Sequence, residues 1–389
     1  MPKMMLALRF DSVFEILHTD PESFARRGQL KTAHGIVETP IFMPVGTQGT
    51  VKSVSPHELK NLQVQIILGN TYHLFVRPGL EIIKRMGGLH SFMNWDLPIL
   101  TDSGGFQVWS LAKMRKITEE GVHFQNHLDG SPTFIGPETS MEIQAGLGSD
   151  IVMLFDECPP YPCDEKYAER SGELTLRWAD RCKEWISINE PLAGKSSGRQ
   201  LHFGIVQGSI YPDLRERSAK GLVELGFDGY AVGGVSVGEP EKEMIAAVEN
   251  SVPFLPEDKP RYAMGLGTPV QMIEMIARGI DMFDCVLPTR VARTGTVYSS
   301  HGTLNLKNQR FASDPLPIEE KCACYSCRNG FSRAYIRHLI KSEEILGIRL
   351  TTLHNLYYYI NLLERARNSI ERGEFEKLRK ELQENCEKE

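Results

Sequence analysis

Short apolar runs that stop at a polar or small residue recur along the chain. Eight of them end at or just before Val45, Asn70, Asp102, Asp156, Gln207, Gly233, Gly265 and Asp284. Continuous apolar runs of this length are typical of parallel strands that are buried on both faces. Helix-like segments, several opened by Ser, Asp or Pro, lie between most of them, at residues 56–62, 137–147, 164–189, 213–225 and 269–278. This alternation predicts an α/β fold, a (β/α)8 TIM barrel.

An open, doubly wound sheet is the alternative fold, and it calls for a glycine fingerprint in its first strand-to-helix turn. Residues 233–238 and 265–267 do not complete GxGxxG, and Gly194-Lys195-Ser196 lacks the upstream glycine of a P-loop. The barrel is therefore favoured. Because the carboxyl ends of barrel strands meet at one mouth, we expect one pocket to be lined by Asn70, Asp102, Asp156, Gln207, Gly234 and Asp284.

Three aspartates at predicted strand ends allow two kinds of site, a divalent-cation site or a site for acid/base and nucleophilic chemistry. Each aspartate alone could instead cap the next helix. The apolar residues before Asp156 and Asp284, together with the amide of Gln207, favour the second kind. A carboxylate that attacks an anomeric carbon forms a covalent glycosyl intermediate, while a second carboxyl transfers the proton.

The segment 101–107 reads Thr-Asp-Ser-Gly-Gly-Phe-Gln. Gly104 and Gly105 let the backbone approach a ligand, and Phe106 is suited to stacking on a flat base. The alternative is a tight loop with a phenylalanine in the core.

Composition and charge narrow the class of protein. The chain has 389 residues, 41% hydrophobic and 24% charged, which excludes a disordered or fibrous protein. The net charge of −6 argues against a nonspecific nucleic-acid binder, but residues 286–345 hold nine Lys/Arg and five Asp/Glu, so this stretch is +4 and the rest is −10. A local basic patch suits contact with a polyanion at one place. With no apolar run long enough to span a membrane and no export signal, we expect a soluble cytoplasmic protein.

The cysteines form one cluster with ligand spacing. Cys322, Cys324 and Cys327, with a histidine, make a Cys3His set, which is typical of structural zinc. His354, which we expect to begin a helix, is preferred as the fourth ligand over His338. No ligand spacing is found for the remaining cysteines, Cys158, Cys163, Cys182, Cys285 and Cys386. The zinc cluster lies inside the basic stretch, which therefore predicts a small subdomain that contacts the polyanion.

Long blocks of the sequence resemble the tRNA-guanine transglycosylases of the bacterial type. They include TPIFMPVGTQGTVK, LGNTYHLFVRPG, LTDSGGFQVWSL, MLFDECPP, GYAVGGVSVGE, DMFDCVLPTRVARTG and CACYSCRNGFSRAYIRHL. The resemblance implies an enzyme that exchanges guanine at wobble position 34 of GUN-anticodon tRNAs, those for aspartate, asparagine, histidine and tyrosine, for 7-aminomethyl-7-deazaguanine (preQ1). It further implies a double displacement through a covalent enzyme–tRNA intermediate, in queuosine biosynthesis.

The resemblance also assigns residue roles. Asp284 is implied as the nucleophile and Asp102 as the proton acceptor and donor. The base would be bound by Asp102, Ser103, Gly104, Gly105, Phe106, Asp156, Gln207 and Gly234. The tRNA would be held by Gly265, Leu266, Gly267, Thr268, Pro269, Val270, Gln271, Thr289, Arg290, Val291, Ala292 and Arg293. One structural Zn²⁺ per subunit would be bound by Cys322, Cys324, Cys327 and His354.

The chain is expected to be organised in three parts. We predict a catalytic barrel at residues 1–308, a zinc-binding subdomain inserted near the C-terminus at 309–352, and C-terminal helices at 353–389 that close onto the barrel. The resemblance also implies a homodimer. Phe106 replaces the usual tyrosine. Val235-Ser236 depart from the usual Leu-Ala, whereas Val237 follows the bacterial pattern and should narrow the space beside the 7-substituent, favouring preQ1 over queuine.

Three rival functions differ in their sequence requirements. A noncatalytic tRNA-binding subunit should lack Asp284 or Asp102, and both are present. An archaeal-type enzyme should carry additional C-terminal RNA-binding domains, whereas here we expect a charged helix at residues 365–389. A barrel glycosidase acting on sugars should not need a basic zinc subdomain.

Overall fold

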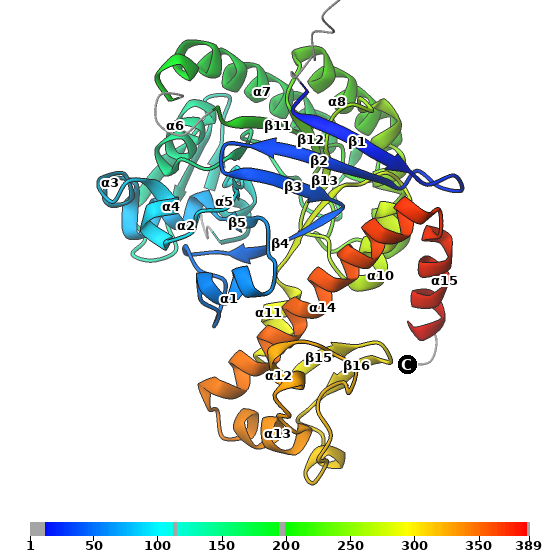
Figure 1. Cartoon of the computed structure of the whole chain (residues 1–389). Helices are drawn as coiled ribbons and strands as arrows, with labels where there is room; N and C mark the ends of the chain where they lie inside the picture. Colours follow the sequence, from blue (N-terminus) through cyan, green and yellow to red (C-terminus); the bar gives the residue numbers. More distant parts are fainter. Residues whose placement is uncertain (1–11, 112–114, 194–198, 387–389) are drawn as a thin grey trace, which may run out of the picture.

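The computed structural model describes residues 12–111, 115–193 and 199–386, and its centre is a closed barrel of eight parallel strands (Figure 1). These are β4 (Ile41–Gly46), β5 (Ile67–Gly69), β6 (Ile99–Thr101), β10 (Ile151–Met153), β11 (Leu201–Val206), β12 (Gly229–Val232), β13 (Arg261–Ala263) and β14 (Met282–Cys285). Their order is β10-β11-β12-β13-β14-β4-β5-β6, and β6 pairs with β10 to close the ring. The prediction of a (β/α)8 TIM barrel is confirmed, with all eight strands where the apolar runs place them.

The five predicted helices are also present, with small shifts at their ends. They are α1 (Pro56–Asn61), α6 (Pro137–Leu147), α7 (Glu165–Ala193), α8 (Pro212–Leu225) and α10 (Pro269–Ile276). Further helical elements around the barrel are α2 (Thr71–Leu74), η1 (Phe75–Gly79), α3 (Leu80–Arg85), α4 (Gly88–Met93), α5 (Gly105–Leu111), α9 (Glu241–Glu249), η2 (Val252–Phe254) and α11 (Leu287–Ala292). Ser55 with Glu58, and Thr268 with Gln271, form capping boxes that fix where α1 and α10 begin.

Two small antiparallel sheets of three strands each were not predicted. The first consists of β1 (Phe14–Thr19), β2 (Arg26–Thr32) and β3 (Gly35–Thr39), and its Phe14, Leu30 and Val37 pack with the barrel-interior residues Ile151 and Leu201. This sheet therefore covers the barrel end at which the strands begin. The second, β7 (Arg115–Ile117), β8 (Val122–Gln125) and β9 (Pro132–Ile135), is inserted between β6 and α6.

The C-terminal part forms a subdomain below the barrel in Figure 1. It comprises β15 (Thr296–Ser299), β16 (Gly302–Asn305), η3 (Gln309–Phe311), α12 (Tyr325–Arg328) and α13 (Arg333–Lys341), and α14 (Ile345–Arg372) runs from it along the barrel. Its own apolar cluster extends from Val297 to Leu350 and includes Cys324 and Cys327. The predicted domain limits at 308/309 and 352/353 stay predictions.

Two expectations about the C-terminal helices were wrong. His354 does not begin a helix but lies inside α14, because the preceding residues 345–353 already continue its helical pattern. The predicted charged helix at 365–389 is instead the end of α14 and a separate α15 (Phe375–Cys386), since Gly373 ends α14 with a left-handed φ of 66°. Residues 387–389 lie outside the described part of the chain.

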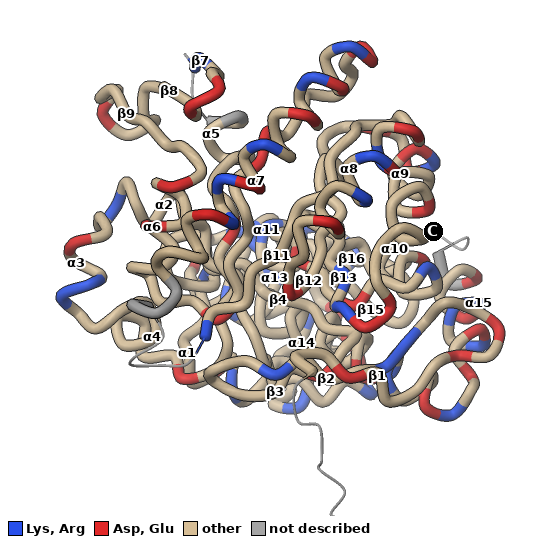
Figure 2. The backbone as a smooth tube through the Cα atoms, turned by 90° about the horizontal axis from the view of Figure 1, so that it is seen from above, with Lys and Arg blue, Asp and Glu red and all other residues tan. Residues whose placement is uncertain are grey.

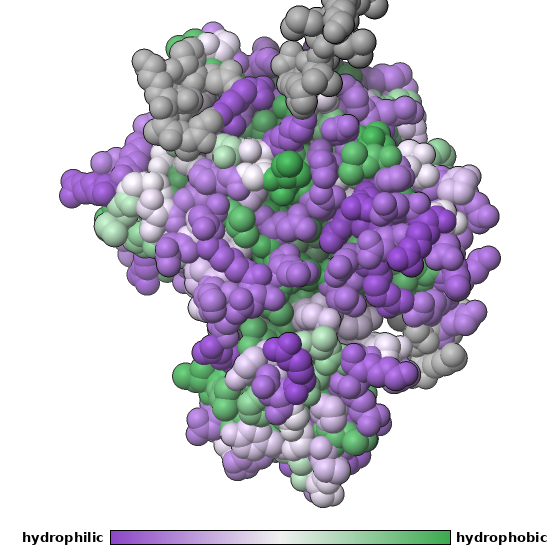
Figure 3. All heavy atoms as spheres, in the orientation of Figure 1, coloured by the Kyte–Doolittle hydropathy of each residue, from purple (hydrophilic) through white to green (hydrophobic). Residues whose placement is uncertain are grey.

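Charged residues are found mostly on the outer helices, where Lys/Arg and Asp/Glu alternate along α7 (Figure 2). The view in Figure 3 shows a largely hydrophilic surface with apolar residues exposed on the subdomain. Among the described helices, none is both long and apolar enough to cross a membrane.

Candidate active site

A cavity of about 600 Å³ opens at the carboxyl ends of the barrel strands. All six residues expected to share one pocket line it: Asn70, Asp102, Asp156, Gln207, Gly234 and Asp284. The lining also includes Ser103, Phe106, the exposed Ser236 and the half-buried Val237. The barrel thus brings together side chains that are up to 214 positions apart, from Asn70 to Asp284.

Asp102 follows β6 and is almost completely buried. The side-chain amide of Asn70 donates to Oδ2, and the backbone N–H of Thr71 donates to Oδ1 over 2.8 Å. Burial raises the pKa of this carboxyl to about 7 against the effect of these donors, and the nearby charge of Asp284 adds to the rise. A carboxyl that titrates near neutrality can both give and take a proton.

The carboxylate of Asp284, on β14, is held in place by hydrogen bonds to one of its two oxygens. The hydroxyl of Tyr262 and the backbone N–H of Gly265 both donate to Oδ1, over 2.5 and 2.7 Å. Within the described chain, Oδ2 accepts no hydrogen bond from the protein, so its lone pairs are available to a ligand. Burial raises the pKa of Asp284, and the two donors oppose that rise.

Asp156 and Gln207 form a second polar group in the cavity. Ser103 Oγ donates to Asp156 Oδ1, and Gln207 Nε2 donates to Asp156 Oδ2, both over 2.7 Å. Gln207 Oε1 is buried without a hydrogen-bond partner. Burial raises the pKa of Asp156, opposed by Ser103 and Gln207. An unpaired buried acceptor beside a carboxylate suits a planar ligand that carries several N–H donors.

The loop after β12 requires glycine at position 234. Gly234 has a φ of 62°, and a Cβ there would lie 2.5 Å from Gln207 Oε1. Arg215, a fully buried residue of α8, donates to the carbonyl oxygens of Ser209 and Gly233 over 2.7 Å and of Gly234 over 3.3 Å. This arginine therefore fixes the loop that carries Gly234.

Sequence reasoning missed Arg215 and Tyr262. Arg215 lies on an amphipathic helix whose pattern resembles any solvent-facing helix, so no sequence signal identifies it. A signal did exist for Tyr262, because it places a hydroxyl in a predicted strand that leads into the pocket.

The segment 103–106 lies at the cavity. Phe106 lines the cavity and is 42% exposed, so its ring is accessible for stacking. Gly104 has a φ of 84°. At position 105 the structure gives a reason for glycine that the sequence did not show, because a Cβ there would lie 2.5 Å from the carbonyl oxygen of Asp156. The approach of the Gly104 and Gly105 backbone to a ligand stays a prediction.

The residues expected to hold tRNA divide into exposed and buried groups. Gly265, Gly267, Gln271 and Arg290 line the cavity, Arg293 is exposed, and Thr268, Pro269, Val270 and Val291 are half-buried. Leu266, Thr289 and Ala292 are buried, so their side chains cannot contact an external ligand. The tRNA-binding role of all these positions stays a prediction, and at the three buried ones any contact would have to come from the backbone.

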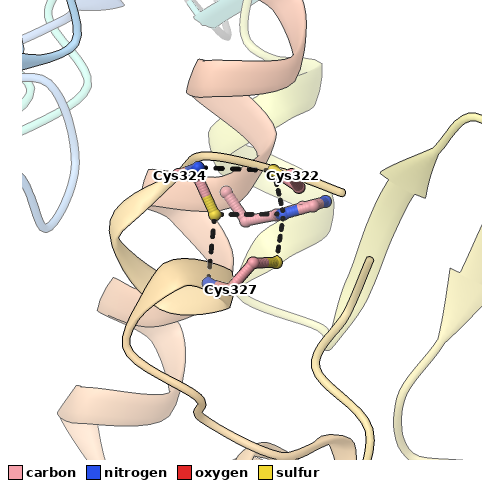
Figure 4. A group of neighbouring side chains, drawn as sticks. Cys322, Cys324 and Cys327 are labelled. Carbon is pink, nitrogen blue, oxygen red and sulfur yellow. Dashed lines mark hydrogen bonds between the residues drawn. The ribbon is translucent and has the colours of Figure 1, made fainter. Parts of the chain in front are cut away.

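The predicted metal ligands converge in the subdomain. Figure 4 shows the side chains of Cys322, Cys324 and Cys327 turned toward one centre. Their sulfur atoms lie 3.7, 3.4 and 3.5 Å from Nδ1 of His354, and the four ligand atoms all lie within 4.8 Å of one another. Nε2 of His354 lies 2.6 Å from the carbonyl oxygen of Tyr298, which orients the ring. His338 is exposed on α13 and is not part of this group.

This donor set can hold a metal ion. Three thiolates and one imidazole are the ligands of structural zinc, and four protein ligands leave no open position for a substrate. The geometry therefore supports a structural rather than a catalytic metal.

Asp102→Asn should stabilise the protein at alkaline pH. Because the pKa of Asp102 is higher in the folded than in the unfolded chain, its contribution to stability is complete below about pH 4 and is lost as the pH rises through about 7. A tenfold change in proton affinity is worth about 1.4 kcal/mol, so we expect the variant to gain roughly 1–3 kcal/mol at about pH 8.5. Thermal melts at about pH 8.5 and pH 5 measure it. An equal gain at both pH values would contradict the argument.

The model of the family described as queuine tRNA-ribosyltransferase matches residues 20–388. A queuine tRNA-ribosyltransferase of Halothermothrix orenii is 55% identical over 357 residues, which cover 92% of this chain and 93% of that protein. Proteins of the same name from Shouchella clausii and Staphylococcus aureus are 58% and 57% identical over 357 residues, covering 92% of both chains in each case.

Proposed function

The chain belongs to the queuine tRNA-ribosyltransferase family and is therefore a pentosyltransferase that modifies tRNA, and on this basis we propose that it replaces guanine 34 of tRNA with preQ1. The substrates would be the GUN-anticodon tRNAs for aspartate, asparagine, histidine and tyrosine, and the product an intermediate of queuosine biosynthesis. We further propose that the protein acts in the cytoplasm, where tRNA is its macromolecular partner.

The observation that carries this proposal is the state of the two facing carboxyls. Asp284 has one oxygen fixed by Tyr262 and Gly265 and the other free, while Asp102 titrates near pH 7 in the same cavity. A fixed carboxylate with a free oxygen suits a nucleophile, and a carboxyl with a neutral pKa suits a proton carrier.

The reaction follows as two displacements at C1′ of the ribose. Oδ2 of Asp284 attacks C1′, the bond from C1′ to N9 of guanine breaks, and protonated Asp102 gives the departing base its proton. The incoming base then loses its N9 proton to Asp102, N9 attacks C1′, and the ester bond to Asp284 breaks. Two inversions retain the configuration. No redox cofactor is required, since no electrons are exchanged with another molecule.

The base would lie against the second polar group. Asp156 would accept from the N–H donors of the pyrimidine ring, while Gln207, whose Nε2 keeps a second hydrogen, and the N–H of Gly234 would donate to the carbonyl oxygen. Phe106 would stack on the base. Val235 and Val237 line the same cavity, and Val237 leaves limited room beside the 7-substituent, which favours preQ1 over queuine.

Base exchange tests this function directly. We expect labelled guanine to enter an unmodified tRNA that carries guanine 34, and unlabelled preQ1 to compete more strongly than queuine. A tRNA with adenine at position 34 is the matched control. Stronger competition by queuine would overturn the choice of base alone, whereas tRNA binding without exchange would support a noncatalytic tRNA-binding subunit.

Arg290→Ala combined with Arg293→Ala should weaken tRNA binding. Both side chains are exposed, and Arg290 lines the cavity mouth. Each lost phosphate contact reduces the magnitude of the slope of log K against log[salt] by roughly 0.7–0.9. Filter binding at several salt concentrations measures that slope. Arg372→Ala, at the far end of α14, is the control that should keep it. An unchanged slope in the double variant would remove these arginines from the interface.

Two further features of the family resemblance remain proposals for this chain. Zn²⁺ would be held by Cys322, Cys324, Cys327 and His354, and when bound it would cross-link the loop before α12 to α14. A homodimer is supported by exposed apolar side chains on the subdomain, with Ile345 75% and Leu346 40% exposed. Sedimentation velocity measures the dimer, and a monomer at all protein concentrations would exclude it.

A further inference from the structure

Three side chains of metal-binding type meet at the opposite end of the barrel from the cavity. His34 lies in the turn between β2 and β3, His90 lies on α4, and Asp150 precedes β10. One ligand atom of each lies within 4.8 Å of the others. We propose that His34, His90 and Asp150, here called the basal site, bind a divalent transition-metal ion such as Zn²⁺, Co²⁺ or Ni²⁺. The basal site does not depend on the proposed function.

The carboxylate of the basal site is rigidly placed. The backbone N–H of Asp150 donates to Ile99 O, and its carbonyl accepts from Leu201, both over 2.8 Å, so the residue is fixed between β6 and β11. Its side chain is fully buried, with Ile99 N–H donating to Oδ2 over 2.8 Å and His34 N–H to Oδ1 over 3.0 Å. Such backbone donors orient a metal-binding carboxylate in advance.

The charge of this carboxylate has weak compensation. In the described parts of the chain, the basic side chains within 4.0 Å of the fully buried Asp150 carboxyl are His34 and His90, and no lysine or arginine lies that close. A buried charge calls for a counter-charge, which a divalent ion supplies.

The histidine nitrogens are already near the required positions. His34 Nδ1 lies 2.8 Å from Asp150 Oδ1, and His90 Nε2 lies 3.1 Å from Asp150 Oδ2. Ligands bound at about 2.0–2.1 Å in a tetrahedral site lie roughly 3.3 Å apart, so each nitrogen must move by a few tenths of an ångström from the carboxylate oxygen that it now contacts.

Ring orientation requires the larger change. The two imidazole rings stack with centroids 3.7 Å apart and planes inclined by 17°. Two stacked rings cannot both direct a lone pair at one ion, so binding must turn one ring. His34 can turn, because it lies in a turn and its side chain is 24% exposed.

The ligand chemistry defines the class of ion. Two imidazoles and one carboxylate suit Zn²⁺, Co²⁺ or Ni²⁺ and leave a coordination position for water. The partial exposure of both histidines, 24% and 13%, gives an ion access from solvent. When bound, the ion would tie the β2–β3 turn and α4 to the base of the barrel.

Cobalt titration of the full-length, zinc-loaded protein tests the basal site. We expect calorimetry to show one equivalent of bound Co²⁺ in addition to one retained zinc, and a visible absorption band of nitrogen and oxygen ligation without a thiolate charge-transfer band. His34→Gln and His90→Gln should each weaken this binding at least about 100-fold. His57→Gln, which changes an exposed histidine on α1, should leave it unchanged.

Three results would overturn the basal site. They are no Co²⁺ binding by the wild type up to about 1 mM, undiminished binding in both the His34 and His90 variants, or a thiolate band showing that Co²⁺ had replaced zinc at the cysteine cluster. Using two variants on different elements guards against one of them failing to fold, and circular dichroism checks each fold.

Discussion

Asp284→Asn should abolish base exchange while leaving tRNA binding within about threefold of the wild type. Asparagine keeps an oxygen that can accept from Tyr262 and Gly265, so the local hydrogen bonds and the fold should persist. Its amide cannot form the ester with C1′, and loss of a covalent nucleophile costs at least about 10⁴-fold in rate. Guanine incorporation measures the rate, and a denaturing gel detects the covalent tRNA adduct, which should be missing.

Asp258→Asn is the matched control for Asp284. It makes the same chemical change at an exposed aspartate in the loop before β13, outside the cavity. Both the rate and the adduct should match the wild type. If Asp284→Asn still formed the adduct, another residue would be the nucleophile; if it lost tRNA binding together with its fold, Asp284 would have a structural role.

Cys324→Ser should release the metal and unfold the subdomain while the barrel stays folded. The subdomain has a small apolar core that runs from Val297 to Leu350 and contains Cys324 itself. Structural zinc sites of this ligand type contribute roughly 10–16 kcal/mol of apparent binding free energy, more than so small a core can replace. Metal analysis should fall from one zinc per chain to none, and hydrogen exchange should accelerate across β15 to α13 but not across β4 to β14.

Cys163→Ser is the control for the cysteine change. Cys163 is a half-buried cysteine outside the cluster whose thiol contacts Ser209 Oγ over 3.5 Å. This variant should retain its zinc and its exchange activity. A Cys324→Ser protein that kept its metal and full activity would contradict the assignment of the cluster.

The barrel and its pocket were predictable because both follow from a repeated local signal. Each buried strand carries an apolar run, and the residue after the run must lie at the mouth, so Asp102, Asp156 and Asp284 could be placed together without long-range information. The three cysteine ligands of the predicted zinc site could also be recognised, because they lie close together in the sequence. His354 could be proposed as a ligand, but it was placed at the start of a helix although the helical pattern of residues 345–353 already runs into it.

Contacts that depend on packing between distant elements could not be predicted. Arg215 reaches the loop of Gly234 because α8 packs against β11, the strand next to β12 in the barrel. Gly105 is required by the backbone of Asp156, 51 positions away. The burial of Leu266 and Ala292 likewise results from tertiary packing. Sequence spacing identifies which residues reach the mouth, and packing decides which of them a ligand can contact.

Helix α14 fixes the relative orientation of two side chains that attach it to different parts of the protein. It carries His354 in the metal cluster and, 13 positions later, Arg367, which donates to the carbonyl of Pro40 beside the barrel over 2.7 Å. Each helical residue turns the chain by about 100° and advances it by about 1.5 Å. One inserted or deleted residue between these positions would therefore point one attachment away from its partner. Surface loops in general tolerate changes of length, but the number of residues in this interval is fixed by the angle between its two attachments.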